Sequence, residues 1–174
     1  MLRSRRGLGS CFGRRPLRRT FEIGSEPRGR TYDDLLYRAF PWCAELWLVV
    51  VPLPGSGDPL LPRAHVVLRE LEPHLSAASD ETEWPGTRLE TGTARVHRYR
   101  LHPEVLDVVA GATDHLYGWR HPELPQDLAL VRGDGTPFLA TVTNEEWAAL
   151  TLDDEERQVL SGDLPELGLR DLWS

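Results

Sequence analysis

A hairpin in the last third of the chain restricts its fold more than any other feature. Residues 128–132 and 138–143 are short apolar and β-branched runs, and the sequence Gly-Asp-Gly at 133–135 separates them. Asp-Gly tolerates the positive φ angles of a tight turn, so the pattern predicts two antiparallel strands. Pro137 cannot donate a ladder hydrogen bond, and we expect it beside the turn or at a sheet edge.

Helices and other strands surround this hairpin without a repeating βαβ unit. Residues 46–51 are uniformly apolar, which favours a central strand buried on both faces, and residues 88–101 also have strand character. The spacing of apolar residues predicts three helices, over 31–40, 62–75 and 103–112. This mixture of elements favours an α+β fold, with a mostly antiparallel sheet, a C-terminal hairpin and about four to five helices.

Two acidic clusters near the carboxyl terminus are assigned to helix starts. Residues 143–150 begin with capping-box spacing, which predicts a short helix, and Thr151 can cap another helix over 151–160. Acids in a first turn interact favourably with the helix macrodipole. This interpretation places four acids at the beginnings of two helices: Glu145, Glu146, Asp153 and Asp154.

Charge is unevenly distributed along the chain. The 174 residues have a net charge of −7, and because residues 1–20 hold seven arginines and no acid, residues 21–174 carry −14. The glycines, proline and unpatterned arginines of residues 1–20 predict a disordered basic arm, which could tether nucleic acid. We expect residues 21–174 to form a single acidic α+β domain, which repels nucleic acid and anionic membrane and favours a basic partner.

The composition also bears on the cellular setting. Every basic side chain is arginine and the chain contains one isoleucine, a bias typical of high-GC bacterial genomes. No apolar run approaches the roughly 20 residues of a membrane span, and no continuous apolar h-region follows the first charges, which argues against a secretory signal. Cys11 and Cys43 lack CxxC spacing, so we expect free thiols in a reducing cytoplasm, with Cys43 buried.

Motifs for catalysis or metal binding are missing from the sequence. The chain has no HExxH, no GxSxG elbow and no phosphate-binding loop of Walker type. His97 and His102 are five residues apart, and His115 and His121 are six apart, so neither pair has the i, i+4 spacing that presents two ligands on one helix face. We therefore expect no metal and no cofactor.

Two other groups of residues could contact a partner. Residues 95–100, Arg-Val-His-Arg-Tyr-Arg, could hold single-stranded nucleic acid, although a charged edge strand explains them more simply. Tryptophan is favoured at the centres of interfaces. Trp84 and Trp119 lie in loop-like segments, which makes them the tryptophans we expect to be exposed as apolar anchors.

Residues 116–146 resemble small uncharacterised bacterial proteins, some of which look like immunity proteins paired with toxins. The shared features are an aromatic-Gly-Trp sequence, a proline followed by Asp-Leu, a short strand, an Asp-Gly turn, a second strand and an acidic pair. The resemblance implies an acidic surface that blocks a basic toxin or nuclease. It supplies no catalytic residues.

Our first hypothesis is therefore a non-enzymatic, immunity- or inhibitor-like domain that binds a basic protein partner. Its expected contact residues are Trp119, Asp127, Glu145, Glu146, Asp153 and Asp154. One alternative is an enzyme of unrecognised type with a pocket near His115, His121 and Asp127. Another is a nucleic-acid-associated protein that acts through the basic arm.

Overall fold

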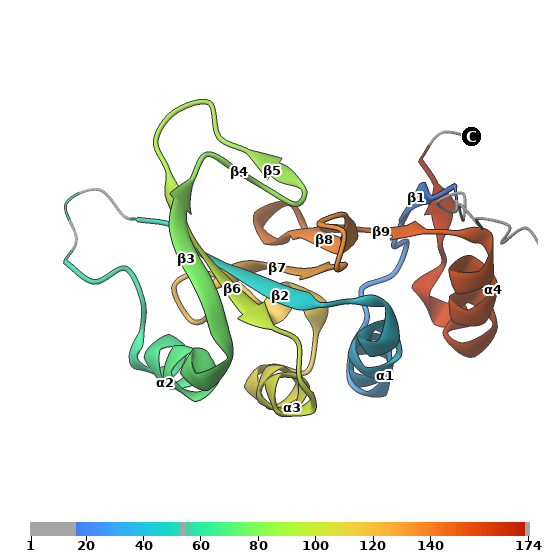
Figure 1. The fold of residues 1–174 in the computed structure, drawn as a ribbon, viewed down its shortest axis with the longest axis horizontal. Helices are drawn as coiled ribbons and strands as arrows, with labels where there is room; N and C mark the ends of the chain where they lie inside the picture. The colour runs from blue at the N-terminus through green and yellow to red at the C-terminus, as the bar shows by residue number, and fades with distance from the viewer. Residues whose placement is uncertain (1–16, 53–54, 56, 173–174) are drawn as a thin grey trace, which may run out of the picture.

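The computed structural model describes residues 17–52, 55 and 57–172. Within them, an eight-stranded antiparallel sheet has the order β10-β1-β9-β8-β7-β2-β6-β3, and β4 and β5 form a small separate hairpin (Figure 1). The strands are β1 (Arg19–Glu22), β2 (Glu45–Val50), β3 (Leu75–Glu81), β4 (Glu83–Trp84), β5 (Thr87–Arg88), β6 (Ala94–Arg100), β7 (Gln126–Val131), β8 (Pro137–Val142), β9 (Trp147–Leu152) and β10 (Arg170–Asp171). The helices are α1 (Arg30–Ala39), α2 (Pro62–Leu71), α3 (Pro103–Ala112) and α4 (Asp154–Asp163).

The helices cover the sheet unequally. Helices α1, α2 and α3 lie side by side against one face, the β4–β5 hairpin stands over the other face, and α4 packs at the end beside β9 (Figure 1). The main core lies between the sheet and the first three helices. Its largest fully buried side chains include Trp119, Tyr32, Tyr99, Phe21 and Phe138.

Most of the expected elements are confirmed. The α+β class and the antiparallel β7–β8 hairpin are present, and Pro137 opens β8 directly after the turn. Helix α1 buries one apolar stripe because its apolar residues recur at helical spacing, and β2 is central, pairing with both β6 and β7.

The prediction of a helix over residues 143–150 is wrong. Residues Thr143–Glu145 form a single 3-10 turn, and the chain then enters β9, which pairs with β8 on one side and β1 on the other. Glu146 leaves the turn at φ 50°. Thr143 and Glu146, the residues with capping-box spacing, therefore lie in the turn between β8 and β9. Pairing of the following segment with two neighbouring strands overrides the local helix signal.

The next helix begins later than the expected Thr151. Asp153 is the N-cap of α4, and it forms a reciprocal capping box with Glu156. Thr151 instead belongs to β9. The acids Asp154, Glu155 and Glu156 occupy the first turn of α4, as expected from the macrodipole argument.

The sequence does not predict strand β3. We expected the α2 helix to continue to Leu75, but α2 ends at Leu71 and Leu75 begins β3 with 37% of its surface exposed. The segment is rich in serine, alanine and acids, which carry little strand signal. Its pairing with β6 makes it an edge strand of the large sheet.

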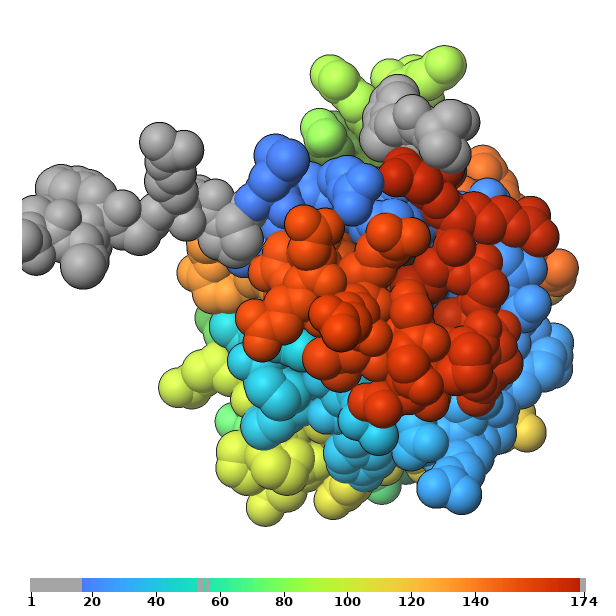
Figure 2. Space-filling view, turned by 90° about the vertical axis from the view of Figure 1, so that its right-hand side faces the viewer, coloured from blue at the N-terminus to red at the C-terminus, as the bar shows by residue number. Residues whose placement is uncertain are grey.

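The sequence predicts that the folded body begins at Phe21, but it begins earlier in the structure. Arg19 and Thr20 already belong to β1, which pairs with β9 and β10 and so joins the two ends of the described chain. Figure 2 shows the blue N-terminal segment packed beside the red C-terminal one. The rest of the predicted arm, residues 1–16, lies outside the described residues, as do residues 173–174.

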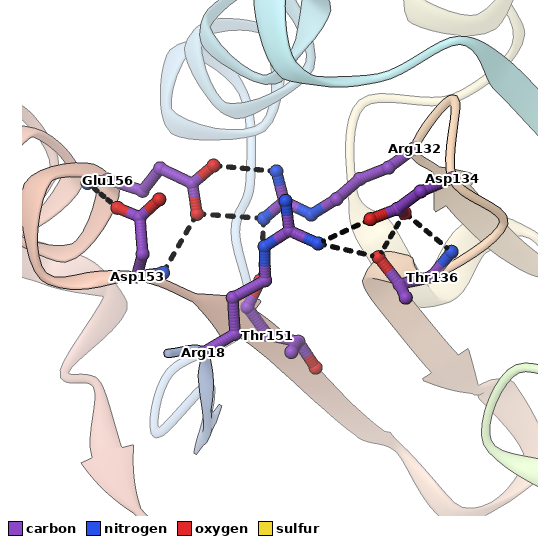
Figure 3. A network of polar contacts seen from close by, with 7 residues as sticks. All are labelled: Arg18, Arg132, Asp134, Thr136, Thr151, Asp153 and Glu156. Atoms are coloured by element: carbon purple, nitrogen blue, oxygen red, sulfur yellow. Dashed lines mark hydrogen bonds and ion pairs between the residues drawn. The ribbon is translucent and has the colours of Figure 1, made fainter. Parts of the chain in front are cut away.

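A buried polar network fixes α4 to the β7–β8 hairpin (Figure 3). Arg132, directly after β7, donates two hydrogen bonds to Glu156 and one to the carbonyl oxygen of Thr151 at 2.8 Å. Beside it, Arg18 donates to Asp134 at 3.0 Å and to Thr136 at 2.9 Å, so the first described residues close over the hairpin turn. Hydrogen bonds from Thr136 and Arg18 hold the pKa of Asp134 well below its usual range.

Candidate functional site

Asp127 is the central polar residue under the β4–β5 hairpin. Its side chain is 2% exposed and accepts three hydrogen bonds. The Oδ2 atom receives the Trp84 indole N–H at 2.9 Å and the Gln126 amide at 3.2 Å, and Oδ1 receives the backbone N–H of Thr143 at 2.9 Å. Asp127 therefore joins the small hairpin, the start of β7 and the β8–β9 turn.

The backbone at this point is held in an uncommon conformation. Asp127 has φ 54°, in the left-handed region that aspartate tolerates better than most residues. The Thr143 hydroxyl accepts the Asp127 N–H at 3.3 Å, so the two residues bond each other in both directions. These two hydrogen bonds hold the Asp127 carboxylate so that its Oδ2 atom faces the Trp84 indole.

A pocket of about 290 Å³ opens beside this carboxylate. The wall surface is mainly apolar, and its polar groups come from β5, the β7 start and the β8–β9 turn. The lining residues are Val51, Trp84, Thr87, Leu89, Gln126, Asp127, Val142, Asn144 and Glu145. Thr87 adds a hydroxyl oxygen that is buried and has no hydrogen-bond partner among the described residues.

The pocket is acidic, and the described residues that line it include no arginine or histidine. Among the described residues, no arginine or histidine pairs with Asp127, whose hydrogen-bond donors are all neutral. The exposed side chain of Glu145 lines the same pocket. It too has no cationic partner in the part of the chain that the structure describes. A positively charged group that enters this pocket would meet two carboxylates in an environment partly shielded from water.

The structure thus brings together two of the expected site residues, Asp127 and Glu145. The prediction that Trp119 and Trp84 are exposed is wrong, because Trp119 is 0% exposed and Trp84 is 4% exposed. Trp119 packs in the main core, where its indole N–H donates to the Tyr32 hydroxyl at 2.8 Å. Loop-like sequence around a tryptophan does not indicate exposure when the loop folds back over the core.

The other expected contact residues lie elsewhere. Glu146 accepts from Arg120 at 3.4 Å, Asp153 caps α4, and Asp154 pairs with Arg19 at 3.0 Å. The two acid pairs flank the six residues of β9, Trp147–Leu152, a length of roughly 20 Å at about 3.3 Å per residue. Of these four acids, only Glu145 lines the Asp127 pocket.

The histidines of the alternative catalytic pocket do not reach Asp127. His115 Nδ1 lies 2.8 Å from an Asp114 carboxylate oxygen and 3.2 Å from the Thr113 hydroxyl. His121 precedes a cis proline. Neither histidine lines the Asp127 pocket, so the three residues do not form one site.

A second cluster was missed because its members are distant in sequence. His74, His102 and Glu104 each offer one ligand atom, and these atoms all lie within 4.8 Å of one another. Comparison of histidines that are close along the chain does not reveal it. The i, i+2 pair formed by His102 and Glu104 was the available signal, but nothing in the sequence indicates that His74 joins it.

Comparison with protein-family models, with curated proteins and with solved structures finds no match for this chain. Within the described residues, no helix has both the length and the apolar character needed to cross a membrane.

Proposed function

We propose that this chain is a non-enzymatic protein-binding domain, of immunity or inhibitor type, that binds a basic protein partner through the Asp127 pocket. The observation that carries the proposal is a buried carboxylate without a cationic partner among the described residues. Burial of an unpaired charge is unfavourable, so an incoming cation is stabilised there. Three neutral donors hold the carboxylate in place before binding.

The shape of the pocket supports an arginine side chain as the bound group. Its volume of about 290 Å³ is below the range of roughly 300–1,000 Å³ that is typical of pockets for drug-sized ligands. Val51, Leu89 and Val142 can contact the aliphatic stem of an arginine. Its planar guanidinium could then reach Asp127 and Glu145, with several donors available to two carboxylates.

The overall charge supports the same kind of partner. Residues 21–174 carry −14, which would speed encounter with a cationic protein and make that encounter sensitive to salt. The resemblance of residues 116–146 to toxin-immunity proteins points to a basic toxin or nuclease as the partner. The pocket lies within or beside that segment, since Gln126, Asp127, Val142, Asn144 and Glu145 all belong to it.

A small probe can test the pocket without knowledge of the partner. We would titrate the full chain with N-acetyl-arginine amide and follow the assigned indole N–H signal of Trp84 by NMR, because this group donates to Asp127. The expected result is a saturable shift with a dissociation constant in the millimolar range, equivalent to about −4 kcal/mol. The neutral isostere N-acetyl-citrulline amide should give no saturable shift.

Matched substitutions sharpen this test. Glu145→Gln keeps the size of an exposed side chain and should weaken arginine binding several-fold without changing the fold, and higher salt should do the same. Glu146→Gln is the control, since Glu146 does not line the pocket. An equal response to arginine and citrulline, or equal effects of the two substitutions, would contradict the proposal.

The two alternative functions have weaker support. The enzyme hypothesis needed His115, His121 and Asp127 around one cavity, and the Asp127 pocket contains neither histidine. For nucleic-acid binding, Arg18 and Arg19 are the described arginines of the arm, and they pair with Asp134 and Asp154. We therefore advance neither as a second proposal.

A further inference from the structure

The cluster formed by His74, His102 and Glu104 lies outside the Asp127 pocket. His74 ends the 3-10 turn Glu72–His74 that follows α2, while His102 and Glu104 begin α3. His74 Nε2 is 3.1 Å from Glu104 Oε2, and His102 Nδ1 is 3.8 Å from the same oxygen. The two imidazole rings stack, with centroids 5.0 Å apart. One Glu104 oxygen thus lies within 4 Å of two histidine nitrogens from different elements.

We propose that His74, His102 and Glu104 bind a divalent transition-metal ion of the zinc class. Two imidazole nitrogens and one carboxylate oxygen are a donor set that suits Zn²⁺, with an open coordination position left for water or another ligand. Metal–ligand distances of about 2.1 Å place tetrahedral ligand atoms about 3.4 Å apart. The separations of 3.1 and 3.8 Å bracket this value.

The lone pairs identify the ligand atoms. His102 Nδ1 accepts the Glu104 backbone N–H at 3.3 Å, which requires an unprotonated Nδ1 with a lone pair on this side of the ring. That bond is long for an N–H donor, so a metal ion can replace it at small loss. On His74, Nε2 faces Glu104 and donates its N–H to that carboxylate in the metal-free chain, so this nitrogen must release its proton to bind a metal ion. Metal binding through these atoms needs side-chain rotation rather than backbone movement.

Exposure supports entry of an ion. The side chains of His102 and Glu104 are 52% and 73% exposed, whereas that of His74 is 19% exposed. His74 is thus the more fixed ligand, and the other two can close over an ion from the solvent side. The positive end of the α3 macrodipole opposes a cation here, and the Glu104 carboxylate offsets it. Loss of the Glu104 charge should therefore weaken binding more than loss of either imidazole.

The experiment is calorimetric titration of the full chain, prepared without a histidine tag, with Zn²⁺ near neutral pH. We expect one ion per chain at this site. His74→Ala and His102→Ala should each reduce affinity at least tenfold, and Glu104→Gln should reduce it further. The control is His115→Ala, because His115 also contacts a carboxylate, that of Asp114, but belongs to no three-residue cluster among the described residues.

A stability measurement gives an independent readout. Binding of Zn²⁺ to the folded chain alone should raise its melting temperature, and a chelator should reverse the rise. Glu104→Gln should abolish the rise while leaving the metal-free melting temperature close to that of the wild type. The proposal is overturned if no zinc binds, or if the same affinity persists in Glu104→Gln and in the two histidine variants.

Discussion

Arg132 and Glu156 form a bidentate ion pair of 2.6 and 2.8 Å at a place where their side chains are only 5% and 6% exposed. The same Glu156 carboxylate also accepts the Asp153 N–H, so one side chain both completes a helix cap and neutralises a buried arginine. The pair connects the β7–β8 hairpin to α4 across 24 residues of sequence. Its removal should therefore affect two parts of the fold at once.

Removal of the charge of Glu156 should be strongly destabilising. Glu156→Gln leaves Arg132 buried without its counter-charge, and we expect the free energy of unfolding to fall by about 3–5 kcal/mol. Urea denaturation followed by tryptophan fluorescence measures this change. Asp154→Asn, at the exposed pair with Arg19, is the control and should have little effect. A Glu156→Gln variant as stable as this control would show that the pair contributes little.

The buried hydroxyl of Tyr32 should also stabilise the core. It accepts the Trp119 indole N–H at 2.8 Å and donates to the carbonyl oxygen of Val109 at 3.3 Å. Tyr32→Phe leaves that buried N–H without an acceptor, so we expect a loss of about 1–3 kcal/mol in the free energy of unfolding. Tyr37→Phe provides the comparison, because Tyr37 is 45% exposed and should tolerate the change. Equal losses in the two variants would argue against this role.

Cys43 should be unreactive while the chain is folded. Burial raises the pKa of its thiol to about 12, so roughly 10⁻⁴ of it is ionised at pH 8. In a Cys11→Ser variant, Cys43 is the remaining thiol. Its reaction with a disulfide reagent at pH 8 should be roughly 1,000-fold slower in the native chain than in urea. Cys43 is half-buried, and rapid native labelling would contradict this rise in the pKa of its thiol.

His97 should make the fold less stable in mild acid. Burial, and then the nearby positive charge of Arg95, lower the pKa of its imidazole. The unfolded chain takes up the proton more readily than the folded chain. The contribution of neutral His97 to the free energy of unfolding is therefore fully present above the ordinary pKa of histidine, and it is lost as the pH falls below that value. His97→Gln should reduce the fall in stability between pH 7 and pH 5. An unchanged pH slope in urea denaturation would refute this assignment.

Local sequence determined the elements whose own residues carry enough signal. The Gly-Asp-Gly turn specified the β7–β8 hairpin, because it needs positive φ where glycine has no steric penalty. The apolar spacing of residues 31–40 specified α1, and the acids after Asp153 indicated the start of α4 within a few residues. Charge also indicated an acidic body, since that depends on composition alone.

Tertiary structure decided what depends on distant partners. The segment after Thr143 became a strand because β8 and β1 offer hydrogen bonds on both sides, which no local capping signal can reveal. Trp119 is a core residue because the fold brings it against Tyr32, whose hydroxyl accepts its indole N–H. The two residues are 87 positions apart in sequence, so local sequence cannot reveal this contact. Asp127 and Glu145, and likewise His74 and His102, converge only when the sheet and helices pack, since contacts between distant residues are set by topology rather than by residue spacing.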